Sequence, residues 1–376
     1  MLPQPPLWLI LIAFLCMLGP LVFFHELGHY LVARWLRIPA EAFSIGFGRE
    51  VVGWTDKQGT RWKVGWLPLG GYVRFVGDMS PASNPVDESE IAPEDRHRAF
   101  ALRPVWQRFL VVLAGPATNF VLAIAIFAAF FATIGMPSTP NRVDGFLPGS
   151  AAQAAGVHIG DRIVAIAGRS TPTFEELFRV VMLRPGERVD LEIMRSGRQI
   201  TIPVTIKTEL QRDRFGQEFK IGRLGIGGAG FEYTRPSAIR LLPEAVVYTF
   251  RTTRGMVDGL AQIVTGRRSV KDVGGPIKVA QVAGQQASLG PLAFVQLLAL
   301  FSINLGFINL LPVPMLDGGH LLFYTVEAVQ RRPVSAKTLD WAFRGGLAVI
   351  FALMVFLTVN DLGSLGLWDR LQRLIG

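Results

Sequence analysis

The strongest chemical pattern in the sequence is His25-Glu26-Leu27-Gly28-His29, close to the N-terminus. On an α-helix, residues four apart lie on the same face, so this spacing brings His25 and His29 together as two ligands of one metal ion. Glu26 is a neighbouring carboxylate that can take a proton from an attacking water. The pattern therefore predicts a zinc site that performs hydrolysis. A hydrogen-bonded cluster at the membrane interface or a transporter's proton relay is the alternative, but neither requires this spacing.

Two histidines and a water leave a tetrahedral zinc ion one protein ligand short. Asp317 supplies a candidate, because it directly follows a long uncharged stretch and lies in Asn309-Leu310-Leu311-Pro312-Val313-Pro314-Met315-Leu316-Asp317-Gly318-Gly319-His320. Two prolines and two glycines within eight residues break a helix there, and broken backbone at membrane depth is tolerated only where protein buries it or a polar cavity lines it. We prefer Asp317 as the third ligand of a single Zn²⁺. His320 is a rival ligand, and an ordinary turn at the end of a helix is the alternative interpretation.

The composition indicates a membrane protein. Half of the 376 residues are hydrophobic and only 18% are charged, whereas a soluble globular protein carries about 25% charged residues. The net charge of +9 could suggest nucleic-acid binding, but membrane proteins also gather lysine and arginine in their cytoplasmic loops. We therefore expect membrane lipid around the chain and no nucleic-acid partner. The single cysteine, Cys16, excludes an intrachain disulfide bond.

Four apolar segments approach or exceed the roughly 20 helical residues that cross a bilayer. We predict transmembrane helices at residues 1–36, 105–136, 291–320 and 341–361, of which the first carries the histidine motif and the third the Asp317 segment. The first segment lacks basic residues before its apolar core and a small-residue cleavage site after it, so we expect it to be retained. Basic residues gather at 34–108 and 325–340, which predicts that these regions face the cytoplasm and that both termini are periplasmic.

The region between the first two helices, residues 37–104, is predicted to be a β-rich loop on the cytoplasmic side. Short strands are expected at Phe43–Gly48, Glu50–Trp54 and Arg61–Phe75, which are rich in glycine, aromatic and β-branched residues. The acidic stretch at 79–98 is expected to be a mobile loop.

Residues 142–230 predict one extracytoplasmic α+β domain. Strand-like runs at Arg162–Ile166, Arg188–Met194 and Gln199–Thr205 surround a helical stretch at Thr173–Met182. Gly145-Phe146-Leu147-Pro148-Gly149-Ser150, followed by Ala155-Gly156-Val157 and Gly160-Asp161-Arg162-Ile163, resembles a bacterial PDZ domain. Such a domain captures an extended peptide or a chain end at a sheet edge.

Two further segments are predicted to be amphipathic. Residues 231–290 form a linker in which arginines alternate with apolar residues, and residues 362–376 form a similar C-terminal tail. Segments of this kind lie in the membrane interface. The predicted fold is therefore a polytopic α-helical membrane protein of about four transmembrane helices, with a membrane-associated β region and one PDZ domain.

Taken in order, the motifs resemble the site-2 protease family, over nearly the whole chain. His25 through His29 in the first helix and Asn309 through Gly319 in a later one carry the resemblance. Pro68-Leu69-Gly70-Gly71-Tyr72-Val73, Ala114-Gly115-Pro116-Ala117-Thr118-Asn119 and the single PDZ domain are similar to the bacterial sigma-E-regulator protease type, although some relatives carry two PDZ domains. The resemblance implies that His25, His29 and Asp317 hold zinc and that Glu26 is the catalytic acid/base. It also implies single-pass membrane proteins as substrates, such as anti-sigma factors or remnant signal peptides, in a bacterial inner membrane.

Four more residues are candidates for substrate binding. Asn304 and Asn309 match positions that the family uses near its active site, although asparagines in membrane helices also hold neighbouring helices together. Gly70 and Gly71 lie in a strand whose edge could pair with an unwound substrate, and glycine allows another backbone to approach closely. Asn119 is expected to hold neighbouring helices together rather than to bind substrate.

Two other classes of function compete with the peptidase. The chain could be a membrane-anchored PDZ scaffold with a non-catalytic metal site, but a structural site has closed coordination and needs no adjacent base such as Glu26. It could also be a transporter with ionisable groups at the bilayer midplane. Such transporters usually show repeated halves with paired broken helices, and the sequence has one break.

Overall fold

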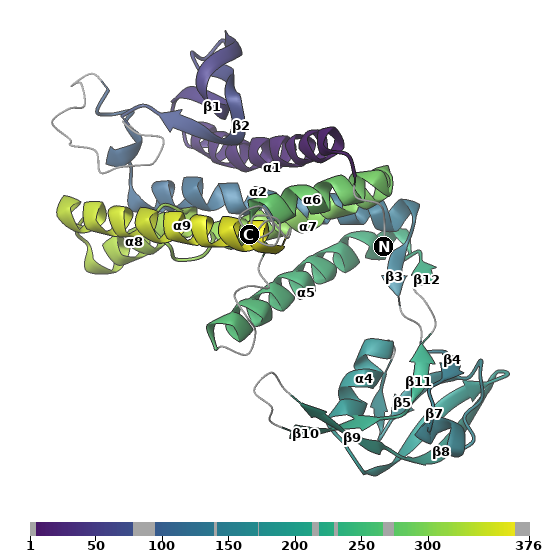
Figure 1. Ribbon diagram of the computed structural model, residues 1–376. Coiled ribbons are helices and arrows are strands. Elements are labelled where there is room, and N and C mark those ends of the chain that lie inside the picture. The colour runs from purple at the N-terminus through teal and green to yellow at the C-terminus, as the bar shows by residue number, and fades with distance from the viewer. Residues whose placement is uncertain are drawn as a thin grey trace, which may run out of the picture. The chain divides into compact units, whose positions relative to one another are not determined.

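The computed structural model describes residues 5–77, 95–138, 141–171, 173–212, 218–228, 232–265 and 274–364. Most of the predicted mobile loop (79–94) and most of the predicted C-terminal tail (365–376) lie outside the described residues. The chain divides into two compact units, Met1–Ala129 with Leu242–Gly376 and Phe130–Leu241. Figure 1 labels the elements of both units, and each unit is described by itself.

Four of the described helices are long and apolar enough to cross a membrane, as the sequence predicts. They are α1 (Leu7–Trp35), α2 (Val105–Thr133), α7 (Pro291–Asn309) and α9 (Ala336–Ser364). At 1.5 Å per residue, the 29 residues of α1 extend about 43 Å, which exceeds a hydrocarbon core of about 30 Å. α9 begins before the predicted position 341, where an ion pair of 3.0 Å between Asp340 and Arg344 supports its first turns.

The predicted transmembrane helix at 291–320 ends earlier than expected. α7 stops at Asn309, and a second helix, α8 (Asp317–Gln330), follows an irregular stretch. The two prolines in that stretch have no N–H to donate to a preceding turn, so the helix cannot continue through them. Asp317 is therefore the first residue of a new helix.

Two glycines hold this irregular stretch against the start of α8. A Cβ atom on Gly318 would lie 2.2 Å from the carbonyl oxygen of Leu311, and one on Gly319 would lie 2.4 Å from that of Val313. Both distances are far below a van der Waals contact, so only glycine lets the turn fold back this closely. The position of Asp317 is fixed by this close packing.

The predicted β-rich loop is a curled sheet of two long strands, β1 (Ala40–Thr55) and β2 (Arg61–Phe75). Two of the three predicted short strands are joined in β1, which bends where Gly46 and Gly48 adopt φ values of 87° and 83°. The segment 42–45 pairs with 61–64 of β2 on one side and with 71–74 on the other. In the described part of the chain, the 71–74 segment has no partner on its other edge.

The predicted linker 231–290 contains two helices in place of a single amphipathic element. They are α5 (Ala238–Val264) and α6 (Pro276–Ser288). α6 packs tightly on α1, since a Cβ atom on Gly284 would lie 2.7 Å from Cγ1 of Ile10. The buried carboxylate of Asp361 in α9 accepts hydrogen bonds of 3.0 Å from two backbone N–H groups at the start of α6. These bonds satisfy donors that a helix N-terminus leaves unpaired.

The second unit is built mainly of sheets. Its described elements are β3 (Met136–Ser138), β4 (Val143–Phe146), α3 (Ala151–Ala154), β5 (Arg162–Ile166), β6 (Arg169–Ser170), α4 (Phe174–Met182), β7 (Arg188–Arg195), β8 (Arg198–Thr205), β9 (Lys207–Arg212), β10 (Glu218–Arg223), β11 (Ile226–Gly228) and β12 (Glu232–Thr234). The central sheet has the strand order β6-β5-β7-β8. The three predicted strands and the predicted helix correspond to β5, β7, β8 and α4, each within one residue of the expected bounds. Alternate residues of β7 point into one core, where Leu191 and Ile193 are completely buried.

An ion pair links the end of β7 to the loop before β5. The carboxylate of Asp161, which is 2% exposed, accepts two hydrogen bonds of 2.8 and 2.7 Å from the guanidinium of Arg195. It also accepts one of 2.8 Å from the backbone N–H of His158. Burial raises the pKa of Asp161, but the hydrogen bonds and charge of Arg195, with the bond from His158, outweigh it and leave the pKa below its usual value.

Candidate metal centre

The two histidines of the motif lie one turn apart on α1 and face the same way. Both side chains are buried, with 8% of each residue exposed. Their Nε2 atoms lie 3.3 Å apart. The i, i+4 spacing that the sequence shows therefore produces a pair of convergent ring nitrogens inside the helical unit.

Asp317 joins the two histidines from the first turn of α8. Its Oδ2 atom lies 3.2 Å from Nε2 of His25 and 3.6 Å from Nε2 of His29. A tetrahedral zinc ion with bonds of about 2.0–2.2 Å separates its ligand atoms by about 3.3–3.6 Å. The triangle of these three atoms matches that separation closely, and among the described residues these are the three grouped tightly enough to hold a metal ion.

The hydrogen bonds on the far side of each ring indicate which nitrogen carries the proton. Nδ1 of His29 donates to the carbonyl oxygen of Val111 at 2.8 Å, because a carbonyl oxygen can only accept. The side-chain amide of Asn119 lies 3.0 Å from Nδ1 of His25. The amide atom at this distance is Nδ2, while Oδ1 of Asn119 is buried without a partner in the described structure. Turning the amide by about 180° would let Oδ1 accept the Nδ1 hydrogen of His25 and would leave Nε2 free for a metal ion.

This arrangement fits a cation. With both Nδ1 atoms protonated, the Nε2 lone pairs of His25 and His29 point toward the carboxylate of Asp317. Oδ2 of Asp317 is buried and accepts no hydrogen bond within the described structure. Three electron-rich atoms that face one another without a shared hydrogen are stabilised by a metal ion, and two imidazoles with a carboxylate are a donor set that suits zinc.

Sequence reasoning missed the role of α2. Asn119 was expected to be packing glue, yet its side chain meets His25, while its backbone oxygen accepts a hydrogen bond of 2.7 Å from Oγ of Ser302 in α7. Gly115 lies one turn earlier, where a Cβ atom would be 2.2 Å from Nε2 of His29. The signal in the sequence was an asparagine one turn after a glycine within a stretch, 109–135, that has no charged residue, but only the packing of α2 on α1 shows its meaning.

The other predicted residues divide into those near the centre and those apart from it. Nδ2 of Asn309 lies 3.5 Å from Nε2 of His25. Asn304 is five residues earlier on the same helix, about 140° around the axis, so it faces another direction. The ring of His320 lies 5.0 Å from that of Phe343, and His320 is not part of the metal-ligand group. The geometry therefore favours Asp317 over His320 as the third ligand.

Glu26 lies beside the centre and next to the sheet. It is not part of the metal-ligand group, and its carboxylate accepts a hydrogen bond from the backbone N–H of Val73 in β2. A Cβ atom on Gly71 would lie 3.1 Å from Cγ of Glu26, and one on Gly70 would lie 2.6 Å from the ring of Phe47. The space that these glycines leave is thus used by this chain's own side chains, and their role in binding substrate stays a prediction.

Comparison with known proteins agrees with this geometry. Residues 13–353 match peptidase family M50. A protein of Agrobacterium fabrum with the provisional name of zinc metalloprotease is 42% identical over 94% of this chain and 96% of its own length. The metalloprotease MmpA of Caulobacter vibrioides is 35% identical over 94% of this chain and 95% of its own. With its HExxH motif and a carboxylate beside the two histidines, the chain belongs to peptidase family M50, the site-2 protease family of zinc metalloproteases.

Proposed function

We propose that the protein is an intramembrane zinc metalloendopeptidase that hydrolyses peptide bonds within or near the transmembrane segments of single-pass membrane proteins. The observation that carries the proposal is the triangle of His25, His29 and Asp317, two of which lie within an apolar helix long enough to cross a bilayer. A zinc ion held there supplies Lewis acidity, which lowers the pKa of water and polarises a carbonyl group.

The side chains around the triangle have separate tasks. Glu26, which is not a ligand, takes the proton of the attacking water and passes it to the leaving amine. The Val73 N–H holds the Glu26 carboxylate in place. Asn309, within 3.5 Å of His25, offers both a donor and an acceptor to a substrate backbone that has lost its helical hydrogen bonds.

An edge of β2 that has no partner strand among the described residues lies beside Glu26 and suggests how the substrate is held. The 71–74 segment of β2 pairs with β1 on one side, and the N–H of Val73 is directed to Glu26. An extended segment that adds to this edge would lie next to the catalytic carboxylate. Strand addition is a common way to bind an unfolded peptide, and it would keep a substrate helix unwound for cleavage.

The remaining parts of the proposal concern location and partners. We place the chain in the bacterial inner membrane as a multi-pass protein, with both termini and the second unit in the periplasm, because basic residues gather in the other loops. The second unit is proposed to be a PDZ domain that binds a peptide or a chain end. Anti-sigma factors and remnant signal peptides are the proposed substrates.

The proposal is tested by co-expressing the protein with a tagged single-pass membrane reporter and comparing wild type with Glu26→Gln. A shorter reporter fragment should appear with wild type and be lost with Glu26→Gln, while zinc bound to the purified variant stays near one ion per chain because Glu26 is not a ligand. Glu187→Gln is the matched control, since Glu187 is exposed in the second unit, and it should cleave as wild type does. Cleavage by Glu26→Gln at the wild-type rate would contradict the assignment of Glu26 and favour a membrane-anchored scaffold.

A further inference from the structure

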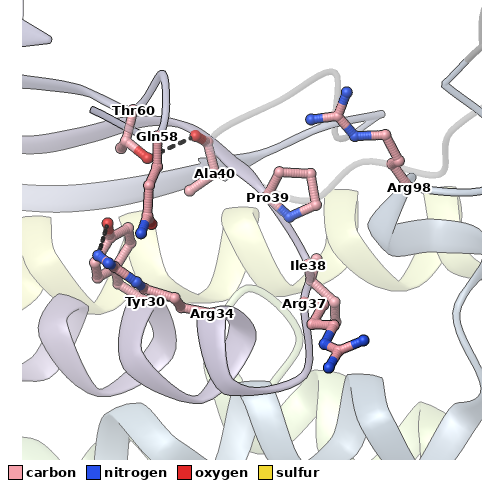
Figure 2. A pocket seen from close by; sticks show the side chains of 9 residues that line it. All are labelled: Tyr30, Arg34, Arg37, Ile38, Pro39, Ala40, Gln58, Thr60 and Arg98. Carbon is pink, nitrogen blue, oxygen red and sulfur yellow. Dashed lines mark hydrogen bonds between the residues drawn. The ribbon is translucent and has the colours of Figure 1, made fainter. Parts of the chain in front are cut away.

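A polar pocket lies at the C-terminal end of α1, apart from the metal centre. It has a volume of about 220 Å³ and is formed by the end of α1, the β1–β2 sheet and the turn at 95–98. Figure 2 shows Arg34 and Gln58 at one side of this pocket and Arg37 and Arg98 at the other. Of the described residues that line the pocket, three are arginines and none carries a carboxylate.

Among the described residues, no carboxylate forms an ion pair with the arginines of the pocket. Arg34 donates a hydrogen bond of 3.1 Å to the hydroxyl of Tyr30, which carries no charge. Within the described residues, neither Arg37 nor Arg98 forms an ion pair, and all three arginine side chains are exposed. Like charges gathered on one pocket repel one another, so an anion bound among them is favoured.

Asp56, whose carboxylate is hydrogen-bonded to Tyr30 in the wall of the pocket, is already engaged. Its carboxylate accepts hydrogen bonds from Tyr30 Oη at 3.1 Å and Trp62 Nε1 at 3.0 Å. It also accepts from the backbone N–H groups of Gln58 at 2.8 Å and Thr60 at 3.0 Å. Asp56 therefore holds the wall of the pocket together and forms no ion pair with the three arginines in the part of the chain that the structure describes.

The backbone beneath the arginines is fixed by specific contacts. Arg37 adopts φ 58°, a left-handed conformation that is uncommon for residues other than glycine. Its carbonyl oxygen accepts a hydrogen bond of 3.0 Å from the Arg103 guanidinium, and the next residue, Ile38, is buried. These contacts fix the backbone at Arg37, which distinguishes the pocket from a loose set of surface arginines.

The pocket lies where a bilayer surface would meet α1. The helix is long enough to cross a membrane, and the pocket begins in its last turn. Trp35, beside Arg34, is 72% exposed, and exposed tryptophan is typical of the membrane–water interface. Phosphate groups of lipids lie at this depth.

We propose that this pocket binds a phosphate group. Arginine guanidinium groups bind phosphate oxygens through paired, charge-assisted hydrogen bonds, and Gln58 adds a neutral donor on the same side as Arg34. The group belongs either to the headgroup of an anionic phospholipid or to a free phosphate or phosphate ester. This site goes beyond the proposed peptidase activity, because it includes no residue of the metal centre.

The test uses the full-length protein purified in a neutral detergent. Native mass spectrometry counts bound phosphatidylglycerol, which is anionic, and phosphatidylcholine, a zwitterionic comparison whose phosphate is balanced by its own ammonium group, while equilibrium dialysis measures binding of radiolabelled inorganic phosphate. The pocket variant is Arg34→Gln/Arg37→Gln/Arg98→Gln. The matched control is Arg331→Gln/Arg332→Gln/Lys337→Gln, which removes the same charge from exposed residues outside the pocket.

A lipid headgroup is the ligand if the pocket variant loses more than about tenfold in phosphatidylglycerol affinity while the control loses less than about twofold. Free phosphate is the ligand if the same contrast holds for inorganic phosphate. Equal losses in both variants would overturn the proposal, because binding would then follow net charge alone. No loss in either variant would also overturn it, because the pocket arginines would then not bind the ligand. If the triple variant does not fold, Arg98→Gln is compared with Arg98→Lys, since Arg98 lies in a turn outside the helices and strands.

Discussion

Gly115 faces the metal centre from α2, and a single methyl group at this position tests whether α2 sets the geometry of the ligands. In Gly115→Ala the new Cβ atom would lie 2.2 Å from Nε2 of His29, which is 1.2 Å short of an ordinary contact of 3.4 Å. Either the ring of His29 turns away or α1 and α2 separate. A functional group displaced by about 1 Å costs about 100-fold in rate, so we expect less than about 1% of wild-type cleavage.

The measurement has two parts. Zinc per chain is determined by elemental analysis of the purified protein, and cleavage of a single-pass reporter is followed in membranes. Gly345→Ala is the matched control, because Gly345 lies inside α9 and its new Cβ atom would have nothing within 4 Å. The control should keep full zinc and full activity, since alanine in an open helical position is favoured over glycine by about 1 kcal/mol.

The two results together separate a damaged metal centre from general misfolding. Overpacking of this kind costs about 1–3 kcal/mol of stability, which should leave Gly115→Ala folded and monodisperse in detergent. A folded variant with low zinc and low activity supports the geometry. Full zinc occupancy together with normal cleavage in Gly115→Ala would refute the argument that α2 presses on the His29 ring.

Three further predictions follow from the same structure. Asp317→Ala should lose zinc and cleavage, whereas His320→Ala should keep its zinc, as elemental analysis of both would reveal; the reverse pattern would move the third ligand to His320. Asn119→Leu should weaken zinc binding by about 10–100-fold in a chelator competition, since it removes the partner of the His25 ring, and unchanged affinity would return Asn119 to a packing role. The folded pKa of Asp161 is below its usual value, so its bonds with Arg195 stabilise the second unit above about pH 4 and this stability is lost as the pH falls through the folded pKa. Protection of the β7 amides, that is, their exchange rate corrected for its intrinsic pH dependence, should therefore fall on acidification below about pH 4 in wild type. Asp161→Asn should already show reduced protection at neutral pH, with a loss of about 2 kcal/mol; equal protection in both at neutral pH would count against the ion pair.

The sequence predicts most of what depends on local spacing and less of what depends on packing. His25, His29 and Asp317 could be chosen because helical spacing and a broken helix are visible in the chain itself. The existence of α8 was not predicted, because its start follows two prolines in a stretch that reads as a terminal turn. Two predicted strands proved to be one because Gly46 and Gly48 bend β1 without ending it.

Contacts between segments that are distant in the sequence could not be predicted from the spacing of residues along the chain. Val111, Gly115 and Asn119 follow one another at intervals of four residues, so they form a single stripe along α2. This stripe accepts the Nδ1 hydrogen of His29, leaves room for its ring and reaches Nδ1 of His25. Rotating α2 about its own axis by one residue, about 100°, would remove all three contacts at once. The HExxH motif supplies the ligands, but the register of α2 against α1 decides whether their lone pairs converge, so the metal centre belongs to two helices rather than to one.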